Sequence, residues 1–361
     1  MKSMSPLGDK ISGANAILRR CIGTKGVWAD PTRYRFQCWT RDFVIAIMPV
    51  LLDSGETLVI KAHLENLSRR QRPNGQIPIL FLDRVLPFLS DKAKRSWRDG
   101  KLSFMLRRFL VGQLWNLTPG TRDSEILYII GMHEYANRTG DRNLVTRYSS
   151  QIRNALGYIE GNLMSDGLVL GCDWRDTMER ELSDKSLLTN NSLLYHAYRL
   201  MGETEKAEQL RKRINERLWT GSSYLDYAGN ARFDPLGGAF AVLYDVVPRE
   251  RYASLAKSFR SVDTPRGVTI SCRHNPISRE EQEVIERTDG VVVWPFVVGF
   301  SILALIKMGE RAMADDQFEK LFRLEGFREW YDPVTGKGYG ALEQLWSATL
   351  FLRSEAARNA K

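Results

Sequence analysis

Helical periodicity runs through nearly the whole chain, and this is the feature that most constrains its fold. In segment 123–139, for example, Ile126, Ile129, Ile130 and His133 fall on one face of a helix. No stretch alternates apolar and polar residues for long enough to form the strands of a central sheet. The pattern therefore predicts an all-α protein.

The predicted helices follow one another along the chain with linkers rich in Gly, Pro, Asn and Asp. Several of them end at a glycine (Gly140, Gly202 and Gly309), as helices commonly do. The expected helical segments are 41–52, 57–68, 103–116, 123–139, 144–163, 187–201, 204–218, 237–245, 249–259, 280–287, 292–308, 310–324 and 341–357.

Two layouts accommodate so many helices: a solenoid of helix pairs, or a closed barrel of six inner and six outer helices. No repeat of solenoid length is visible, which disfavours the first layout. Segment 292–308 is almost entirely apolar, as expected of a helix covered on all sides, whereas 204–218 is strongly amphipathic. We therefore predict an (α/α)6 barrel. Because no Pro/Gly/Ser-rich linker interrupts the chain, we expect a single domain over residues 1–361, in which 1–35 form a leading helix and loop.

Composition excludes several classes of function. The net charge is +9, but Lys and Arg are spread along the chain without a nucleic-acid motif, so we expect no nucleic-acid partner. The four cysteines are far apart and form no CxxC pair, and neither a zinc site nor a disulfide framework is expected. No metal or organic cofactor is required by any pattern found.

We also expect no membrane association. The most apolar stretch, Val291–Ile306, is interrupted by Pro295 and Gly299 and is shorter than the roughly 20 residues that a bilayer span needs. The first residues lack the apolar region of a secretory signal, which favours a cytoplasmic protein. The oligomeric state is not readable from these patterns.

Unusual residues gather in the predicted loops, where tryptophan stands beside Asp, Glu or Arg. An aromatic face stacks on the C–H face of a sugar ring, while carboxylates and guanidinium groups bind its hydroxyls. The alternative is structural, because Asp42 and Asp123 are also in positions to cap helices. The segments concerned are 37–43, 72–78, 119–125, 171–178 and 329–348.

Taken together, these segments resemble the (α/α)6-barrel glycoside hydrolases. The nearest likeness is to the amylo-α-1,6-glucosidase domain of glycogen debranching enzymes, and a more distant one to processing α-glucosidase I, trehalase and neutral invertase. The residues that carry the resemblance are Trp39-Thr40-Arg41-Asp42, Gly75-Gln76-Ile77-Pro78, Arg122-Asp123, Trp174-Arg175-Asp176, Glu329-Trp330-Tyr331-Asp332-Pro333 and Gln344-Leu345-Trp346-Ser347, in that order. The chain has no room for the substantial β-sandwich that many relatives carry at their N-terminus.

The resemblance implies an inverting, exo-acting hydrolase of an α-glucoside or a related α-linked saccharide. Asp176 is its general acid, with a pKa raised by burial against Trp174, and Glu329 is its general base. Asp173, three residues earlier, is the alternative acid, and Glu343 is a second candidate for the base. The substrate-binding residues implied are Trp39, Arg41, Asp42, Gln76, Arg122, Asp123, Trp174, Trp294, Gln344 and Trp346.

Two other functions remain open at this point. A sugar epimerase on the same barrel uses paired histidines, but His63, His133 and His196 fall in predicted helices, and only His274 lies in a predicted loop. A non-catalytic carbohydrate-binding protein is the other possibility, although the carboxylates expected of an enzyme are all present.

Overall fold

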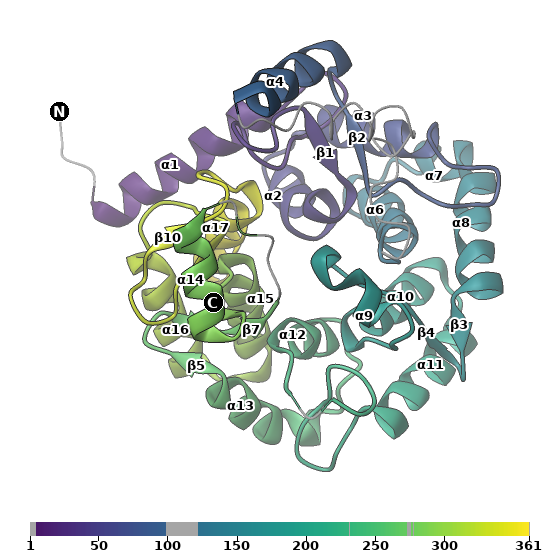
Figure 1. Cartoon of the computed structure of the whole chain (residues 1–361). Coiled ribbons are helices and arrows are strands. Elements are labelled where there is room, and N and C mark those ends of the chain that lie inside the picture. Colours follow the sequence, from purple (N-terminus) through teal and green to yellow (C-terminus); the bar gives the residue numbers. More distant parts are fainter. Residues whose placement is uncertain (1–4, 99–121, 231, 273–275, 277, 361) are drawn as a thin grey trace.

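A closed ring of inner helices forms the centre of the computed structural model (Figure 1), which describes residues 5–98, 122–230, 232–272, 276 and 278–360. Each inner helix packs on the next, and the last returns to the first. The inner helices are η1 (Asp42–Ile47, a π-helix) continued by α2 (Met48–Asp53), α6 (Ser124–Thr139), α10 (Leu188–Met201), α12 (Pro235–Leu243), α15 (Pro295–Met308) and α17 (Leu345–Asn359). The (α/α)6 barrel is thereby confirmed.

The outer helices alternate with the inner ones along the chain and cover them from outside (Figure 1). They are α1 (Pro6–Cys21), α3 (Thr57–Ser68), α8 (Ser149–Asn162), α11 (Thr204–Arg217), α13 (Tyr252–Ser261) and α16 (Arg311–Arg323). Composition explains the division. All of Pro295–Ile302 in inner α15 is buried, whereas outer α11 buries only Ala207, Leu210 and Ile214.

Most helix boundaries lie close to those expected from the sequence. Helix α15 starts at Pro295, whose ring suits the first helical position, and ends at Gly309, whose φ of 86° is left-handed. The predicted helix 144–163 is instead divided at Tyr148 into α7 (Asn143–Arg147) and α8. The predicted helix 103–116 lies outside the described residues.

Further short elements lie in the connections between barrel helices. They are α4 (Val85–Arg98), η2 (Asp176–Met178), α9 (Glu179–Leu182), η3 (Arg249–Arg251) and α14 (Arg279–Thr288). Among the described residues, these connections also contain five antiparallel pairs of short strands: β1 (Gln37–Trp39) with β2 (Leu80–Leu82), β3 (Met164–Ser165) with β4 (Leu168–Val169), β5 (Asp263–Thr264) with β6 (Gly267–Val268), β7 (Ile270–Ser271) with β8 (Val291–Val292), and β9 (Trp330–Tyr331) with β10 (Gly338–Tyr339).

The first and last parts of the chain meet where the ring closes. The Leu345 amide donates to the Ala29 carbonyl at 2.9 Å, and the Arg353 guanidinium of α17 donates to the Ile45 carbonyl of η1 at 2.8 Å. We call this junction between η1 and α17 the seam. It brings residues 29–42 next to residues 329–346, and the connections at this end of the barrel surround a cavity.

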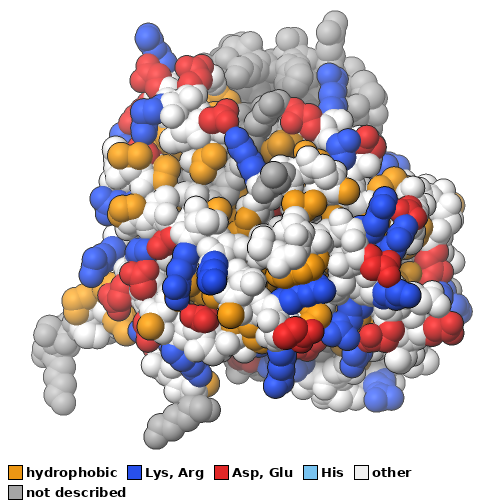
Figure 2. Space-filling view, turned by 90° about the horizontal axis from the view of Figure 1, so that it is seen from below, with side chains coloured by type: hydrophobic (Ala, Val, Ile, Leu, Met, Phe, Trp, Pro, Cys, Tyr) orange, Lys and Arg blue, Asp and Glu red, His pale blue; other side chains and the backbone are white. Residues whose placement is uncertain are grey.

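The outer surface carries charges of both signs. In Figure 2, basic and acidic side chains are interspersed over the face in view, and apolar groups are scattered between them. Among the described residues, no helix is both long and apolar enough to span a bilayer.

Candidate active site

A cavity of about 200 Å³ opens among the connections that surround the seam. Its walls come from separate stretches of the chain, which only the barrel brings together. The lining residues are Ala29, Arg33, Tyr34, Trp39, Arg41, Asp42, Trp174, Asp176, Thr177, Cys272, Glu281, Trp294, Glu329, Trp330, Gln344 and Trp346.

Most of the residues singled out from the sequence line this cavity. They are the predicted acid and base, Asp176 and Glu329, together with Trp39, Arg41, Asp42, Trp174, Trp294, Gln344 and Trp346. Four others do not line it: Asp173, Gln76, Arg122 and Asp123.

Glu329 lies beside β9, with 12% of its side chain exposed. Its Oε1 accepts a hydrogen bond from the Tyr34 hydroxyl at 3.0 Å, and its Oε2 accepts from the Ala341 amide at 2.8 Å and pairs with Arg33 at 3.2 Å. Burial raises the pKa of this carboxyl, and the partial compensation by Arg33, Ala341 and Tyr34 leaves the pKa above its ordinary value. All of these partners hold the carboxylate oxygens in defined directions.

Asp176 lies on the segment Cys172–Met178, where the chain turns into η2. Arg41 donates to its Oδ1 at 3.2 Å and also binds Asp123 through two nitrogens. The Asp176 side chain is 24% exposed, against 3% for Asp123. Asp176 is thus the member of this ion-pair group that faces the cavity, while Asp123 holds Arg41 from behind.

Asp42 lies at the same cavity as Asp176 and Glu329, and Glu281 is a fourth carboxylate in its wall. Asp42 is the first residue of η1, and Gln344 donates to its Oδ1 at 3.3 Å across the seam. Burial raises the pKa of Asp42 to about 7, and the negative charges of Glu329 and Asp176 act in the same direction. These effects on the pKa mean that Asp42, Asp176 and Glu329 share one electrostatic environment.

Three tryptophans from distant segments form an aromatic wall. The ring centroid of Trp174 lies 5.0 Å from that of Trp294 and 6.4 Å from that of Trp346, and Trp346 stacks on Phe296 at 3.9 Å. Within the described structure, the buried indole N–H groups of Trp39, Trp174 and Trp346 make no hydrogen bond. Buried donors are nearly always paired in folded proteins. The indole N–H groups of Trp39, Trp174 and Trp346 are therefore available to donate to the oxygens of a ligand.

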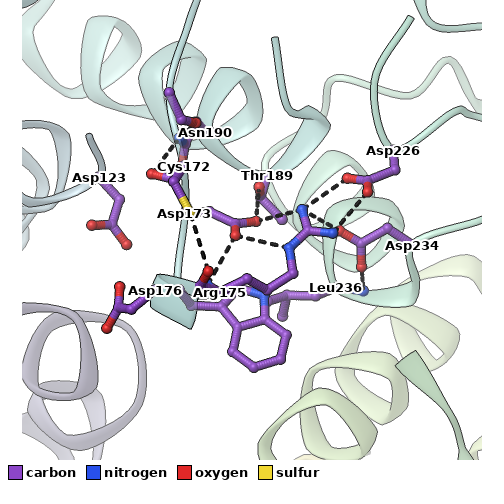
Figure 3. Close-up of polar contacts among 12 residues, drawn as sticks. Asp123, Cys172, Asp173, Arg175, Asp176, Thr189, Asn190, Asp226, Asp234 and Leu236 are labelled. Carbon is purple, nitrogen blue, oxygen red and sulfur yellow. Dashed lines mark hydrogen bonds and ion pairs between the residues drawn. The ribbon is translucent and has the colours of Figure 1, made fainter. Parts of the chain in front are cut away.

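Asp173 has a different environment from Asp176, although it was the alternative acid. Its oxygens accept from Arg175 at 2.9 Å on both sides and from the Thr189 hydroxyl at 2.6 Å (Figure 3). Burial favours its neutral form, but Arg175 and Thr189 outweigh this and hold the pKa of Asp173 below its ordinary value. With a pKa below its ordinary value and no place in the wall of the cavity, Asp173 is poorly suited to donate a proton to a ligand there.

The other predicted residues that miss the cavity each have a structural contact. Gln76 lies in the turn 72–76, where its side-chain oxygen accepts a hydrogen bond from Asn74 at 3.0 Å. Arg122 packs its aliphatic part on Gly171. Glu343, the second candidate for the base, pairs with Arg20 at 2.6 Å on the outer side of the seam.

Several cavity residues belong to no motif recognised in the sequence. Arg33 and Tyr34 precede the first motif, and Cys272 and Glu281 lie between motifs. The only available signal was the aromatic and basic run Arg33-Tyr34-Arg35-Phe36 next to Gln37.

Histidines and metal ligands play no visible part in the described cavity. None of the described histidines lines it, and His274 lies outside the described residues. The part of the chain that the structure describes also contains no group of three or more side chains suited to a metal ion.

Comparisons with known proteins point to one class. Residues 184–347 match the family model of the mannosylglycerate hydrolase MGH1-like glycoside hydrolase domain. A mannosylglycerate hydrolase of Rubrobacter radiotolerans is 31% identical in an alignment of 187 residues that covers 45% of this chain. That match spans only 42% of the relative's length.

Solved structures resemble the chain over nearly its whole length. A wild-type glycosidase superposes with a TM-score of 0.68 at 14% identity, covering 98% of this chain and 97% of that one. The GH63 mannosylglycerate hydrolase from Thermus thermophilus, solved with glucose, gives a TM-score of 0.64 at 15% identity over 95% and 99% of the two chains. A rhamnosidase from Klebsiella oxytoca gives 0.62 at 12% identity over 99% of this chain and 65% of its own.

At such low identity, these structures establish the fold alone. The resemblance to glycoside hydrolases is supported by the family model over residues 184–347, whereas the particular likeness to debranching enzymes stays a prediction. Residues 184–347 thus match a glycoside hydrolase family model, and the chain as a whole has the (α/α)6-barrel fold of the solved glycosidases.

Proposed function

We propose that this chain is an inverting, exo-acting glycoside hydrolase that cleaves a small α-linked saccharide. The observation that carries the proposal is that Asp176 and Glu329, far apart in sequence, line one tryptophan-walled cavity. The matched glycoside hydrolase domain and the glycosidase fold support the same conclusion.

Asp176 is the general acid in this proposal and Glu329 the general base. Glu329 removes a proton from water, the water oxygen attacks the anomeric carbon, and the bond from that carbon to the leaving oxygen breaks. The proton of Asp176 passes to the leaving oxygen, so one glycoside and one water give a free sugar with a hemiacetal hydroxyl and the released alcohol. Glu329 then holds the proton taken from water and Asp176 is ionised, and exchange of protons with solvent restores both groups. Inversion requires the two carboxyl groups to be roughly 6.5–9.5 Å apart, which leaves space for the water.

The remaining cavity residues bind the sugar. Trp39, Trp174, Trp294 and Trp346 present aromatic faces and indole groups, while Asp42 and Gln344 bind hydroxyls from the two sides of the seam. Arg41 binds the Asp176 carboxylate and so orients it. The small volume of about 200 Å³ favours one terminal sugar ring over an internal position in a polymer.

The relatives suggest which substrates to try first. One named relative is a mannosylglycerate hydrolase, and one solved neighbour contains glucose. We therefore propose α-glucosides and α-mannosides as the substrate class, with mannosylglycerate as the first compound to assay.

The test is a screen of aryl α-glycosides, α-linked disaccharides and mannosylglycerate, with the released anomer followed by NMR. We expect a β-anomer as the first product, which demonstrates inversion. Asp176→Asn and Glu329→Gln should fold and bind sugar but lose at least about 10² in rate, the usual scale of acid–base catalysis. Sugar binding by the unchanged protein without turnover would support the non-catalytic function instead.

A further inference from the structure

The segment Cys172–Met178 separates two cavities. Trp174, Asp176 and Thr177 line the cavity described above. Arg175 and Met178 line a second cavity of about 290 Å³ on the other side of the segment. Because open space lies on both sides, packing supports only part of this segment, and its position depends on polar contacts.

Arg175 provides most of those contacts on the side of the second cavity. Its Nε and Nη2 each donate to Asp173 at 2.9 Å, and its Nη1 and Nη2 donate to Asp226 at 2.7 and 2.9 Å (Figure 3). All three side chains are at least 94% buried. The planar guanidinium therefore binds two carboxylates in a forked geometry that leaves it little freedom.

A third carboxylate ties this group to the barrel. Asp234 Oδ2 lies 3.9 Å from Arg175, and its Oδ1 accepts from the Leu236 amide and caps the start of inner helix α12. Thr189, in inner helix α10, donates to Asp173. Arg175 thus connects the segment to two helices of the inner ring.

Arg41 binds the same segment from the side of the first cavity. It donates to the backbone carbonyls of Asp173 and Trp174 at 3.2 and 3.4 Å, and to the Asp176 carboxylate. Figure 3 shows the Asp176 carboxyl turned away from Arg175, toward Asp123. The segment is therefore bracketed by two arginines, and only Asp176 among its acidic side chains faces the sugar cavity.

We propose that Arg175, held by Asp173 and Asp226, is a positioning residue that sets where the Asp176 carboxyl stands in the cavity. The inference rests on the proposed function, since it assigns Arg175 a role in the same reaction. Buried ion pairs are weak evidence for stability but give defined geometry. Proton transfer to a leaving oxygen depends on that geometry, because a displacement of about 1 Å can reduce the rate by about 10².

The experiment compares substrates that do and do not need an acid. Methyl α-glycosides have a poor leaving group and need protonation, whereas glycosyl fluorides need little. The variants are Asp226→Asn, which removes the charge and replaces one of the two oxygens that accept from Arg175 by a donor, and Arg175→Lys, which keeps the charge without the planar guanidinium. We expect kcat on the methyl α-glucoside or α-mannoside to fall at least about tenfold, while KM and the rate on the matching α-fluoride stay within about threefold.

The matched control is Asp263→Asn. Asp263 also pairs with a largely buried cation, Lys320 at 2.7 Å, but it lies on β5 in a different connection of the barrel. This variant should lose stability without changing the ratio of the two rates. If Arg175→Lys does not fold, Thr189→Val removes a single hydrogen bond to Asp173 and should give the same pattern with a smaller amplitude.

The outcomes test separately the positioning role of Arg175 and the assignment of Asp176 as the general acid. If Asp226→Asn and Thr189→Val reduce both rates by the same factor, or change neither, Arg175 does not position the acid. Asp176→Asn is the reference and should show the same selective loss in a stronger form. If that reference keeps its rate on the methyl glycoside, the assignment of the acid in the proposed function fails, whatever the Arg175 variants do.

Discussion

At the scale of single residues, the chemistry of the cavity depends on how each carboxyl group is surrounded. Asp173 is buried and Glu329 is mostly covered, and both pair with arginine, yet their pKa values move in opposite directions. The difference is that Arg175 and Thr189 bond to Asp173 from several sides at short distance, whereas burial dominates at Glu329. The carboxylate of Asp173 therefore holds Arg175 in place, whereas the carboxylate of Glu329 is the proposed base.

Tyr34 offers a direct test of the environment of Glu329. Its hydroxyl donates to Oε1 at 3.0 Å and thereby favours the charged carboxylate. Tyr34→Phe should raise the pKa of Glu329 further, so that the base ionises only at higher pH. We expect the acid limb of kcat/KM to move up by about one pH unit, with activity recovering above it.

Tyr198→Phe is the matched control for that measurement. Tyr198 also donates to a glutamate, Glu160 at 3.1 Å, but the pair lies between α10 and α8, outside the cavity. Its pH profile should coincide with that of the unchanged protein. A Tyr34→Phe profile with the same acid limb as the control would contradict the proposed role of Glu329 as the base.

Many of the cavity residues could be predicted from the sequence, but the sequence did not decide between Asp173 and Asp176 as the acid. The motifs that carry the family resemblance identified Trp39, Asp176 and Trp346, because their neighbours along the chain make up those motifs. The choice between Asp173 and Asp176 depended on Thr189 and on the pairing of Arg175 with a distant aspartate, contacts that reach only one of the two candidates. Tyr34 was missed for the same reason, because its partner Glu329 lies at the other end of the chain.

At the scale of elements, the sequence predicted the helix types well because burial is reflected in composition. An almost wholly apolar segment became inner helix α15, and an amphipathic one became outer helix α11. The break at Tyr148 was not foreseen, since its residues continue the helical pattern while its backbone, at φ −106° and ψ 23°, leaves it. Strand pairs of two or three residues are too short to show a period at all.

Close packing between inner helices gives a prediction at this scale. A Cβ added at Gly299 in α15 would meet Leu350 Cβ of α17 at 2.6 Å. Gly299→Ala should therefore lower the free energy of unfolding by about 1–3 kcal/mol through overpacking. Chemical denaturation followed by circular dichroism measures the change.

The same substitution on an outer helix should have the opposite sign. Gly157 is exposed in α8, and an added Cβ there meets nothing within 4 Å. Gly157→Ala should raise the free energy of unfolding by about 0.5–1 kcal/mol, since alanine loses less backbone entropy in a helix. Equal effects at the two positions would contradict the division into inner and outer helices.

At the scale of the whole molecule, the cavity joins parts of the chain that the barrel holds together. A sugar bound there contacts residues on both sides of the seam and should stabilise the folded state as a unit. At about 100 times its Kd, a ligand that binds only the native state adds about 2.7 kcal/mol. We expect glucose or mannose to raise Tm by a few degrees in a concentration-dependent way, as calorimetry measures.

The control separates binding from a general effect of polyols. Sorbitol at the same concentration acts through exclusion from the surface and should raise Tm less. Trp39→Ala, which removes one aromatic face of the cavity, should respond to the sugar no more than to sorbitol. A sugar effect that survives in Trp39→Ala would mean that the stabilising site lies elsewhere.

The seam also has a consequence for the order in which the protein becomes competent. A nascent chain presents Asp42 and Asp176 long before residues 329–346 have been synthesised, and those late residues supply Glu329, Gln344 and Trp346. A partly synthesised chain can therefore contain the proposed acid, Asp176, before it contains the proposed base, Glu329. We expect catalytic activity to appear in a single step, when α17 packs against η1 and closes the ring of inner helices.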